Sequence, residues 1–228
     1  MHKYFFCVRK KMSLKKNYYE IRFGDADAVA ELLQRISDKD DIGEILSQGI
    51  CHTATVFGME DQAVHVKGME PAGYDPRVLK GMGLGYATSD RGACHLRATF
   101  YKPELAGIIE PDQIEGKAKM FVDFEDRLTL FDAMILCKFF RDIYPWERLG
   151  TLIAASTGID GSQKNLMQIA QSISTKVRDF NIREGMTKAH EQLLAAFHEK
   201  LDDSDKVITQ NENSILIKEY TALRNWKK

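Results

Sequence analysis

Apolar residues recur at helical spacing along most of the chain, beginning just after Gly24. Asp25 is placed to cap a first helix, whose apolar positions fall at i, i+3, i+4 and i+7: Val29, Leu32, Leu33 and Ile36. A second helix is predicted after Asp41, where the order Asp41-Ile42-Gly43-Glu44 has the form of a capping box. One face of this second helix carries Ile42, Ile45, Leu46 and Ile50.

Longer helical patterns fill the second half of the chain. One run opens at Glu115 and passes into the segment 128–140, which is apolar nearly all round and carries charge only at Asp132 and Lys138. Another helix is predicted from Pro145 to Gly158, because proline suits a first turn and glycine a helix end. The next is predicted from a cap at Asp160 to a stop at Gly185, followed by a shorter amphipathic set at Leu193, Leu194, Phe197 and Leu201 and a polar loop over 202–213.

Strand signals are short and few by comparison. The β-prone pieces Thr53–Phe57 and Ala63–Val66 are predicted to be loop or a small pairing, and Tyr4–Val8 a short extended segment. The pattern therefore predicts an all-α, multihelical fold with two packed helical subdomains that meet near Val66. We divide the chain into a basic tail (1–17), a partial first subdomain (18–66) and a second subdomain (67–228) that carries the candidate chemistry.

The stretch from His65 to Arg97 departs from the regular pattern. Asp75 and Pro76 predict a helix start, yet Gly81, Gly83 and Gly85 follow at once, and each glycine costs a helix about 1 kcal/mol relative to alanine. Such glycines allow a close approach of the backbone to a ligand or to another element. The stretch therefore predicts either the wall of a cofactor site or a glycine-packed helix pair.

Composition and charge exclude several classes of protein. Lys and Arg total 32 against 33 Asp and Glu, so the net charge of −1 gives no basic field for nucleic acid. No apolar run approaches the roughly 20 residues of a membrane span. The four cysteines (Cys7, Cys51, Cys94 and Cys137) form no Cys-x-x-Cys pair, so no local zinc or iron–sulfur site is expected, and each alone is predicted to be a small buried residue. These features indicate a cytoplasmic protein without disulfides.

Asp132 is the candidate that periodicity alone singles out. A carboxylate in an apolar, buried helix requires hydrogen-bond donors or a cation nearby. Neighbouring amides or an arginine could supply them, in which case Asp132 is structural. Alternatively, the carboxylate could accept hydrogen bonds from the N–H groups of a ligand.

Several blocks in one register resemble a known family, the tungsten-pterin aldehyde:ferredoxin oxidoreductases. The blocks are His65-Val-Lys-Gly68, Tyr74-Asp-Pro-Arg77, Lys80-Gly-Met-Gly-Leu84, Tyr86-Ala-Thr88, Arg91-Gly-Ala-Cys-His95, Asp132-Ala-Met-Ile-Leu-Cys137 and Phe180-Asn-Ile-Arg-Glu-Gly185. Segments near Phe23 and over Lys218–Trp226, the latter similar to the family's closing helix, extend the resemblance across most of the chain. The resemblance implies the fold of the family's C-terminal helical domains.

The resemblance also implies site residues for a tungstopterin or molybdopterin and a [4Fe–4S] cluster. Arg91, Gly92 and Arg97 would contact the pterin and its phosphates. At the second motif, Asp132, Leu136 and Lys138 would contact the pterin. His95 would stand at the open face of the metal and transfer a proton, and Cys137 would be one thiolate ligand of the cluster. The implied reaction is oxidation of an aldehyde to a carboxylate, with electrons passed through the cluster to ferredoxin.

Departures from the family pattern limit this expectation. Ile135 stands where the family has glycine in Asp-x-x-Gly-Leu-Cys, and the Cys-x-x-Cys-x-x-x-Cys and Asp-x-x-Gly-Leu-Asp motifs are not found. We therefore expect the C-terminal part of an enzyme, completed by a β-rich N-terminal chain or segment and inactive, without cofactor, on its own. The surface around Gly81–Arg97 is expected to be exposed and to bind that partner or a second copy. The alternative is a non-catalytic helical remnant or interaction domain without cofactor.

Overall fold

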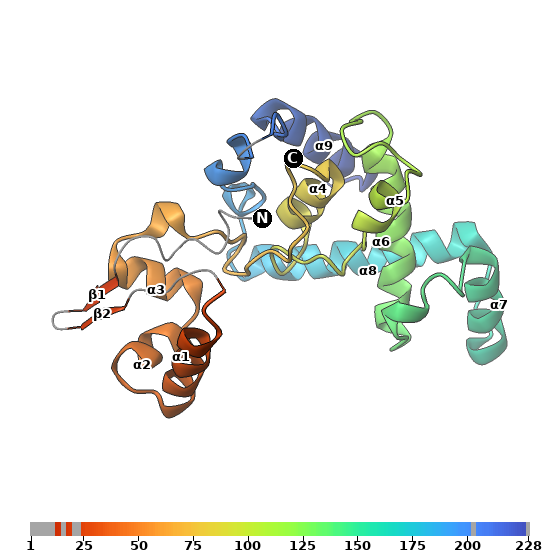
Figure 1. The fold of residues 1–228 in the computed structure, drawn as a ribbon. Helices are drawn as coiled ribbons and strands as arrows, with labels where there is room; N and C mark the ends of the chain where they lie inside the picture. The colour runs from red at the N-terminus through yellow and green to blue at the C-terminus, as the bar shows by residue number, and fades with distance from the viewer. Residues whose placement is uncertain (1–11, 15–16, 20–23, 202–203, 227–228) are drawn as a thin grey trace.

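The structure, a computed structural model, describes residues 12–14, 17–19, 24–201 and 204–226, and it is nearly all helical (Figure 1). The predicted Tyr4–Val8 segment lies outside these residues. A small antiparallel hairpin pairs β1 (Met12–Leu14) with β2 (Asn17–Tyr19). The helices are α1 (Ala26–Asp38), α2 (Asp41–Ser47), α3 (Ile50–Phe57), α4 (Lys80–Thr88), α5 (Tyr101–Leu105), α6 (Lys117–Ala133), α7 (Trp146–Thr157), α8 (Gln163–Arg183) and α9 (Gln210–Leu223). The predicted all-α fold class is confirmed.

Helices α1, α2 and α3 form a group set to one side of the larger helical body in Figure 1. Asp25 caps α1 as predicted, accepting a hydrogen bond from the backbone N–H of Ala28 at 3.0 Å. The predicted capping box at Asp41 is wrong, because Asp40 is the N-cap of α2 and makes no side-chain cap bond. The β-prone loop or small pairing predicted at Thr53–Phe57 is also wrong, since these residues form most of α3.

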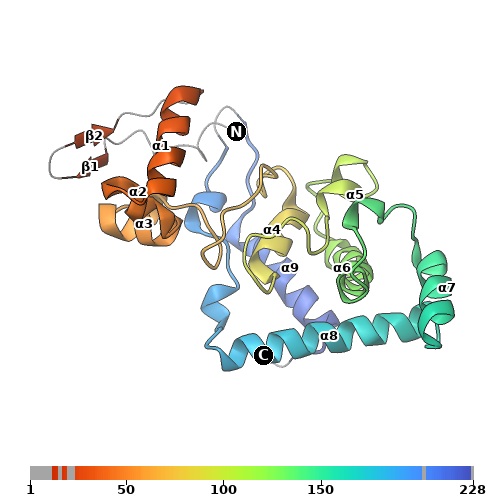
Figure 2. The same ribbon diagram turned by 90° about the horizontal axis from the view of Figure 1, so that it is seen from below.

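Helix α4 lies at the centre of the larger body, against α9 and α6 (Figures 1 and 2). It begins at Lys80 rather than at Pro76, because the Asp75 carboxylate instead accepts from the backbone N–H (2.9 Å) and the guanidinium (2.8 Å) of Arg77. All nine residues of α4 are buried. A Cβ on Gly81 would lie 2.3 Å from the ring of Phe100. The glycines therefore serve packing within the chain, and the exposed surface predicted for this helix is wrong.

The larger body has two apolar clusters. One surrounds α4 and includes Phe100, Phe121 and Phe197, while the other joins the second half of α6 to α7 and α8 through Leu128, Leu149 and Leu166. Helix α8 begins at the cap Ser162 rather than at Asp160, which instead accepts hydrogen bonds from the backbone and hydroxyl of Ser162. Helix α9 starts within the predicted polar loop, with a capping box between Thr209 and Glu212.

Buried ion pairs join α6 to α5 and to the end of α9. Lys117 Nζ contacts Glu104 Oε1 with both side chains fully buried, and the same oxygen accepts from the backbone N–H of Gly81 at 2.8 Å. Arg224, just after α9, contacts Glu125 and Asp126 on α6. Over the described residues, no helix is both long and apolar enough to cross a membrane.

Candidate functional site

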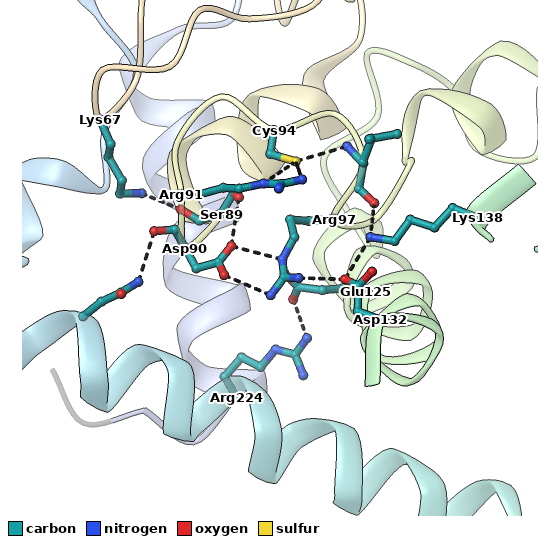
Figure 3. A network of polar contacts seen from close by, with 12 residues as sticks. Lys67, Ser89, Asp90, Arg91, Cys94, Arg97, Glu125, Asp132, Lys138 and Arg224 are labelled. Atoms are coloured by element: carbon teal, nitrogen blue, oxygen red, sulfur yellow. Dashed lines mark hydrogen bonds and ion pairs between the residues drawn. The ribbon is translucent and has the colours of Figure 1, made fainter. Parts of the chain in front are cut away.

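Asp132 lies at the end of α6 and forms the centre of a charged cluster (Figure 3). Its Oδ2 accepts hydrogen bonds from Arg97 Nη1 and from Lys138 Nζ, both at 2.9 Å. The side chain is 41% exposed, so the predicted burial of Asp132 is wrong. Arg97 and Lys138 satisfy the carboxylate, as expected if Asp132 has a structural role. Its exposed position also leaves it accessible to a ligand.

The segment after Asp132 turns away from the helix in a Schellman motif. The backbone N–H of Leu136 donates to the carbonyl of Phe131 at 2.8 Å, and that of Ile135 donates to the carbonyl of Asp132 at 3.2 Å. Ile135 occupies the left-handed position of this motif with φ of 57°. The helix therefore ends here instead of continuing to Phe140, as the apolar pattern had predicted.

We expect Ile135→Gly to raise the free energy of unfolding by about 0.5–1 kcal/mol, although it removes a large apolar side chain. A β-branched residue with positive φ is strained by about 1–2 kcal/mol, whereas glycine adopts this conformation freely at some cost in unfolded-state entropy. Ile135 is 93% exposed, so little packing is lost. Urea unfolding measures the change, and Ile143→Gly, at a half-exposed position without positive φ, is the control. A loss of stability in Ile135→Gly would contradict the strain.

The residues that follow place the second motif at the surface. Leu136 packs against the cluster of α6, α7 and α8, whereas Cys137 is exposed and its thiol is free. The expectation that each cysteine is buried therefore fails for Cys137, and also for Cys51, but holds for Cys94. Lys138 Nζ donates to the carbonyl of Leu96 at 3.1 Å as well as to Asp132. The two motifs predicted to share a site thus meet at Lys138.

The loop between α4 and α5 supplies the other predicted residues. Arg91 is exposed, and its guanidinium donates to Cys94 Sγ at 2.9 and 3.2 Å. Gly92 is buried with φ of 112°, and a Cβ there would lie 2.2 Å from the carbonyl oxygen of Val66. Arg97 donates from Nη2 to Asp90 Oδ2 at 3.1 Å and from Nη1 to Asp132, and its Nε forms an ion pair with Asp90 Oδ1 at 3.0 Å. Gly92 therefore fits a close backbone contact, and Arg97 joins the loop to α6.

His95 is partly buried beside two tyrosines. Its ring centroid lies 5.8 Å from that of Tyr74 and 6.4 Å from that of Tyr101, and the two tyrosine rings stack at 4.0 Å. Burial, and then the positive charge of Arg91, lower the pKa of His95 below its usual value. A neutral imidazole at pH 7 can accept a proton.

The structure thus brings Arg97, Asp132 and Lys138 into direct contact, with Arg91 and His95 on the same loop as Arg97. Roles for Asp90 and for two more distant side chains, Lys67 and Asn181, were not predicted. Lys67 and Asn181 stand in quoted sequence blocks, but their contacts are 20 or more residues away along the chain. Sequence spacing could not have identified those contacts.

Within the described part of the chain, no group of three or more His, Cys, Asp or Glu side chains could hold a metal ion. The donor set nevertheless suits the predicted groups. Arginine and lysine fit phosphate oxygens, a carboxylate accepts from ring N–H groups, and an exposed thiol can become one ligand of an iron–sulfur cluster. Any metal held here would need further ligands from outside the described residues.

Comparisons with known proteins give a consistent result. The family model described as aldehyde ferredoxin oxidoreductase, domains 2 and 3, matches residues 5–228. The chain is 31% identical over 177 residues to the tungsten-containing aldehyde ferredoxin oxidoreductase of Thermococcus kodakarensis, covering 76% of this chain and 29% of the relative. It is 31% identical over 183 residues to the Pyrococcus abyssi protein of the same name, covering 78% and 30%. The chain thus spans less than a third of these relatives.

A solved structure shares the fold. The active site complex BamBC of benzoyl coenzyme A reductase, in complex with 1,5-dienoyl-CoA, matches with a TM-score of 0.65 and 20% identity. The match covers 95% of this chain and 39% of the other. At this identity the likeness supports the helical architecture alone.

Proposed function

The chain belongs to the aldehyde ferredoxin oxidoreductase family, and we propose that it is the C-terminal part of a tungsten-pterin or molybdenum-pterin enzyme of that family. In this proposal the complete enzyme oxidises an aldehyde to a carboxylate and passes the electrons through a [4Fe–4S] cluster to ferredoxin. The tungsten-containing relatives named above support the choice of reaction class.

The observation that carries the proposal is the junction at Asp132. Arg97 from one motif and Lys138 from the other meet on a single carboxylate oxygen, and all three side chains retain some exposure. We assign Arg97 and Lys138 to the phosphate and ring oxygens of the pterin, and Asp132 to its ring N–H groups. Arg91, also exposed, adds positive charge, and Gly92 and Leu136 keep the backbone beside it in place.

The bound metal would supply the two-electron redox step. In the balanced reaction an aldehyde and water yield a carboxylate, two electrons and three protons. His95, whose pKa is lowered by burial, is the residue of this chain that would accept one of these protons at an imidazole nitrogen. The Tyr74 and Tyr101 rings beside it would restrict the access of water to that nitrogen.

Cys137 would supply one thiolate of the cluster, and the remaining ligands would come from the partner segment. Its neighbour Lys138 contacts Asp132, so the same short segment would adjoin both redox groups. Exposed apolar side chains beside Cys137, such as Phe139 (88% exposed), and on α1, such as Leu33 (62% exposed), would be covered in the complete enzyme. A second copy of this chain is the other candidate for covering them.

The test is complementation with the missing part of the enzyme. The chain is co-expressed in a tungstate-supplied anaerobic host with a segment corresponding to the N-terminal two-thirds of a relative such as the Thermococcus kodakarensis protein. We expect the copurified assembly to contain tungsten and iron and to reduce a viologen dye with an aldehyde, whereas the chain alone should be colourless and inactive. Cys137→Ser should lower the iron content of the assembly.

One control and one contradicting outcome complete this test. Cys51→Ser changes another exposed cysteine and should leave the iron content unchanged. Assembly without metal or activity would contradict the enzymatic proposal and favour the non-catalytic interaction domain.

A further inference from the structure

Two backbone carbonyls at the end of α4 point to one ammonium group. Lys67 Nζ donates to the carbonyl of Ala87 at 2.9 Å. It also donates to the carbonyl of Ser89 at 2.8 Å, as Figure 3 shows. Lys67 lies in a two-residue turn closed by paired hydrogen bonds between Val66 and Met69. Lys67 and Gly68 both have positive φ, as in a type I′ turn. The turn therefore aims the lysine at the loop that follows α4.

The next carbonyl, that of Asp90, is bound by a side chain from α8. Asn181, in the last turns of α8, donates from Nδ2 to the carbonyl of Asp90 at 3.0 Å. Residues 87, 89 and 90 thus have their carbonyl groups bound by side chains from two distant elements. These carbonyls lie immediately before Arg91 and Gly92 in the chain.

The side chain of Asp90 connects the Ser89–Asp90 backbone to the site, because it contacts Arg97. Its Oδ2 accepts a hydrogen bond from Arg97 Nη2 at 3.1 Å, and its Oδ1 forms an ion pair with Arg97 Nε at 3.0 Å. The remaining terminal nitrogen of Arg97 donates to Asp132. The orientation of Arg97 is therefore fixed between two carboxylates, one of which is placed by Lys67 and Asn181.

Charged and aromatic side chains surround Lys67 and Asn181. Burial lowers the pKa of Lys67 to about 8, and the charges that act on it come from Glu191, Asp90 and Arg178. Arg178, one turn before Asn181, forms a bidentate pair with Glu191 and stacks 4.4 Å over the Trp226 ring. Burying part of the Lys67 side chain costs free energy unless its ammonium group is hydrogen-bonded. The carbonyls of Ala87 and Ser89 supply those hydrogen bonds.

We propose that Lys67 and Asn181 are positioning residues that clamp the Ser89–Asp90 backbone and thereby hold Arg97 in the orientation needed at the Asp132 site. The role of Arg97 toward a pterin rests on the proposed function; the clamp itself is a property of this chain. Neither clamp residue is expected to touch the cofactor or the substrate.

The test follows the Arg97 side chain by ¹⁵N NMR in the chain alone. Its Nε–H resonance is assigned by its disappearance in Arg97→Lys, and its rate of exchange with water reports how closely the guanidinium is held against Asp90. Asn181→Asp replaces the Nδ2 donor with a carboxylate oxygen, and Lys67→Met removes both lysine bonds. Each substitution should raise the exchange rate of this proton about tenfold, because about one hydrogen bond of constraint is lost.

The matched control is Asn165→Asp. Asn165 lies on the same helix and likewise donates from Nδ2 to a backbone carbonyl, that of Asp160, at 2.7 Å. It should leave the Arg97 proton unchanged, and Lys67→Arg, which retains N–H donors, should largely restore the slow exchange. An unchanged rate in Asn181→Asp, with a native-like backbone spectrum, would overturn the clamp even if Lys67→Met failed to fold. Because no cofactor is used, failure of the complementation experiment would leave this result unaffected.

Discussion

Arg224→Met should lower the free energy of unfolding by about 3–5 kcal/mol, the usual cost of removing one partner from a buried ion pair. The Arg224 side chain is 1% exposed and contacts both Glu125 and Asp126, whose side chains are 7% and 4% exposed. Tyr220 donates to the same Glu125 oxygen at 2.7 Å and cannot neutralise it. Without the guanidinium, two adjacent carboxylates would remain buried with no counterion.

The loss should depend on pH in a defined direction. Burial raises the pKa of Asp126 to about 6, even though Arg224 opposes that shift. Removing Arg224 raises the pKa further, so the folded variant binds more protons than the unfolded chain over a wider range above pH 4. The stability of the variant therefore falls as pH rises through that range, and its deficit relative to wild type should be larger at pH 7.5 than at pH 5.

Urea unfolding at the two pH values, followed by far-UV circular dichroism, measures both effects. Arg183→Met, at an exposed position on α8, should change the free energy of unfolding by less than about 0.5 kcal/mol. In a Glu125→Gln, Asp126→Asn background, the cost of Arg224→Met should shrink, since no buried charge is left unpaired. Equal costs in both backgrounds would show that Arg224 stabilises the protein by packing alone.

The sequence predicted long, strongly periodic helices well and short ones poorly. Helix α8 fills most of the span predicted from Asp160 to Gly185, with Leu166 and Ala170 buried, and Gly158 ends α7 in a left-handed conformation as expected. The segment Thr53–Phe57 of α3 was predicted to be loop or a small β-pairing because Thr53 and Val56 favour strands. There, flanking glycines and the burial of Ala54 override the local preference.

The end of α6 shows why apolar composition misled. A helix that is apolar on all faces is expected to be buried, yet Ile135 and Phe139 are almost fully exposed. The Schellman stop could not be recognised, because the residue at its left-handed position is isoleucine rather than glycine. The resemblance still predicted the residues that meet there, since Arg97, Asp132 and Lys138 are in contact.

Contacts between side chains far apart in the chain could not be predicted from the sequence, for a physical reason. Arg224 is 98 residues from Asp126, and Asn181 is 91 residues from the carbonyl that it binds. The first pairing depends on how α6 packs against α9, and the second on how α8 lies against the loop after α4. Periodicity predicts which face of a helix is buried but not which element covers that face. Residue type alone therefore could not distinguish Arg224 and Asn181 from ordinary surface side chains.

His95→Ala in the complemented enzyme is expected to lower kcat by roughly 10²–10⁴-fold, the usual scale of a lost general base, while tungsten and iron contents stay at the wild-type level. The ring is held by aromatic contacts rather than by the charged cluster around Asp132, so its removal should spare cofactor binding. Burial and Arg91 lower the pKa of His95, which keeps the imidazole neutral at pH 7 and able to accept a proton.

The pH profile separates this role from a merely structural one. As a proton acceptor, His95 is active above its pKa, so kcat/KM of the wild-type assembly should rise with pH through an acidic limb centred below about 6.5, the ordinary value for histidine. That limb should disappear in His95→Ala and in His95→Gln, both assayed by anaerobic dye reduction with an aldehyde. His52→Ala, which changes an exposed histidine on α3, should retain the limb and the rate. Near-normal turnover in His95→Ala, or an unchanged acidic limb, would remove His95 from the reaction and assign the proton transfer to a residue of the partner segment.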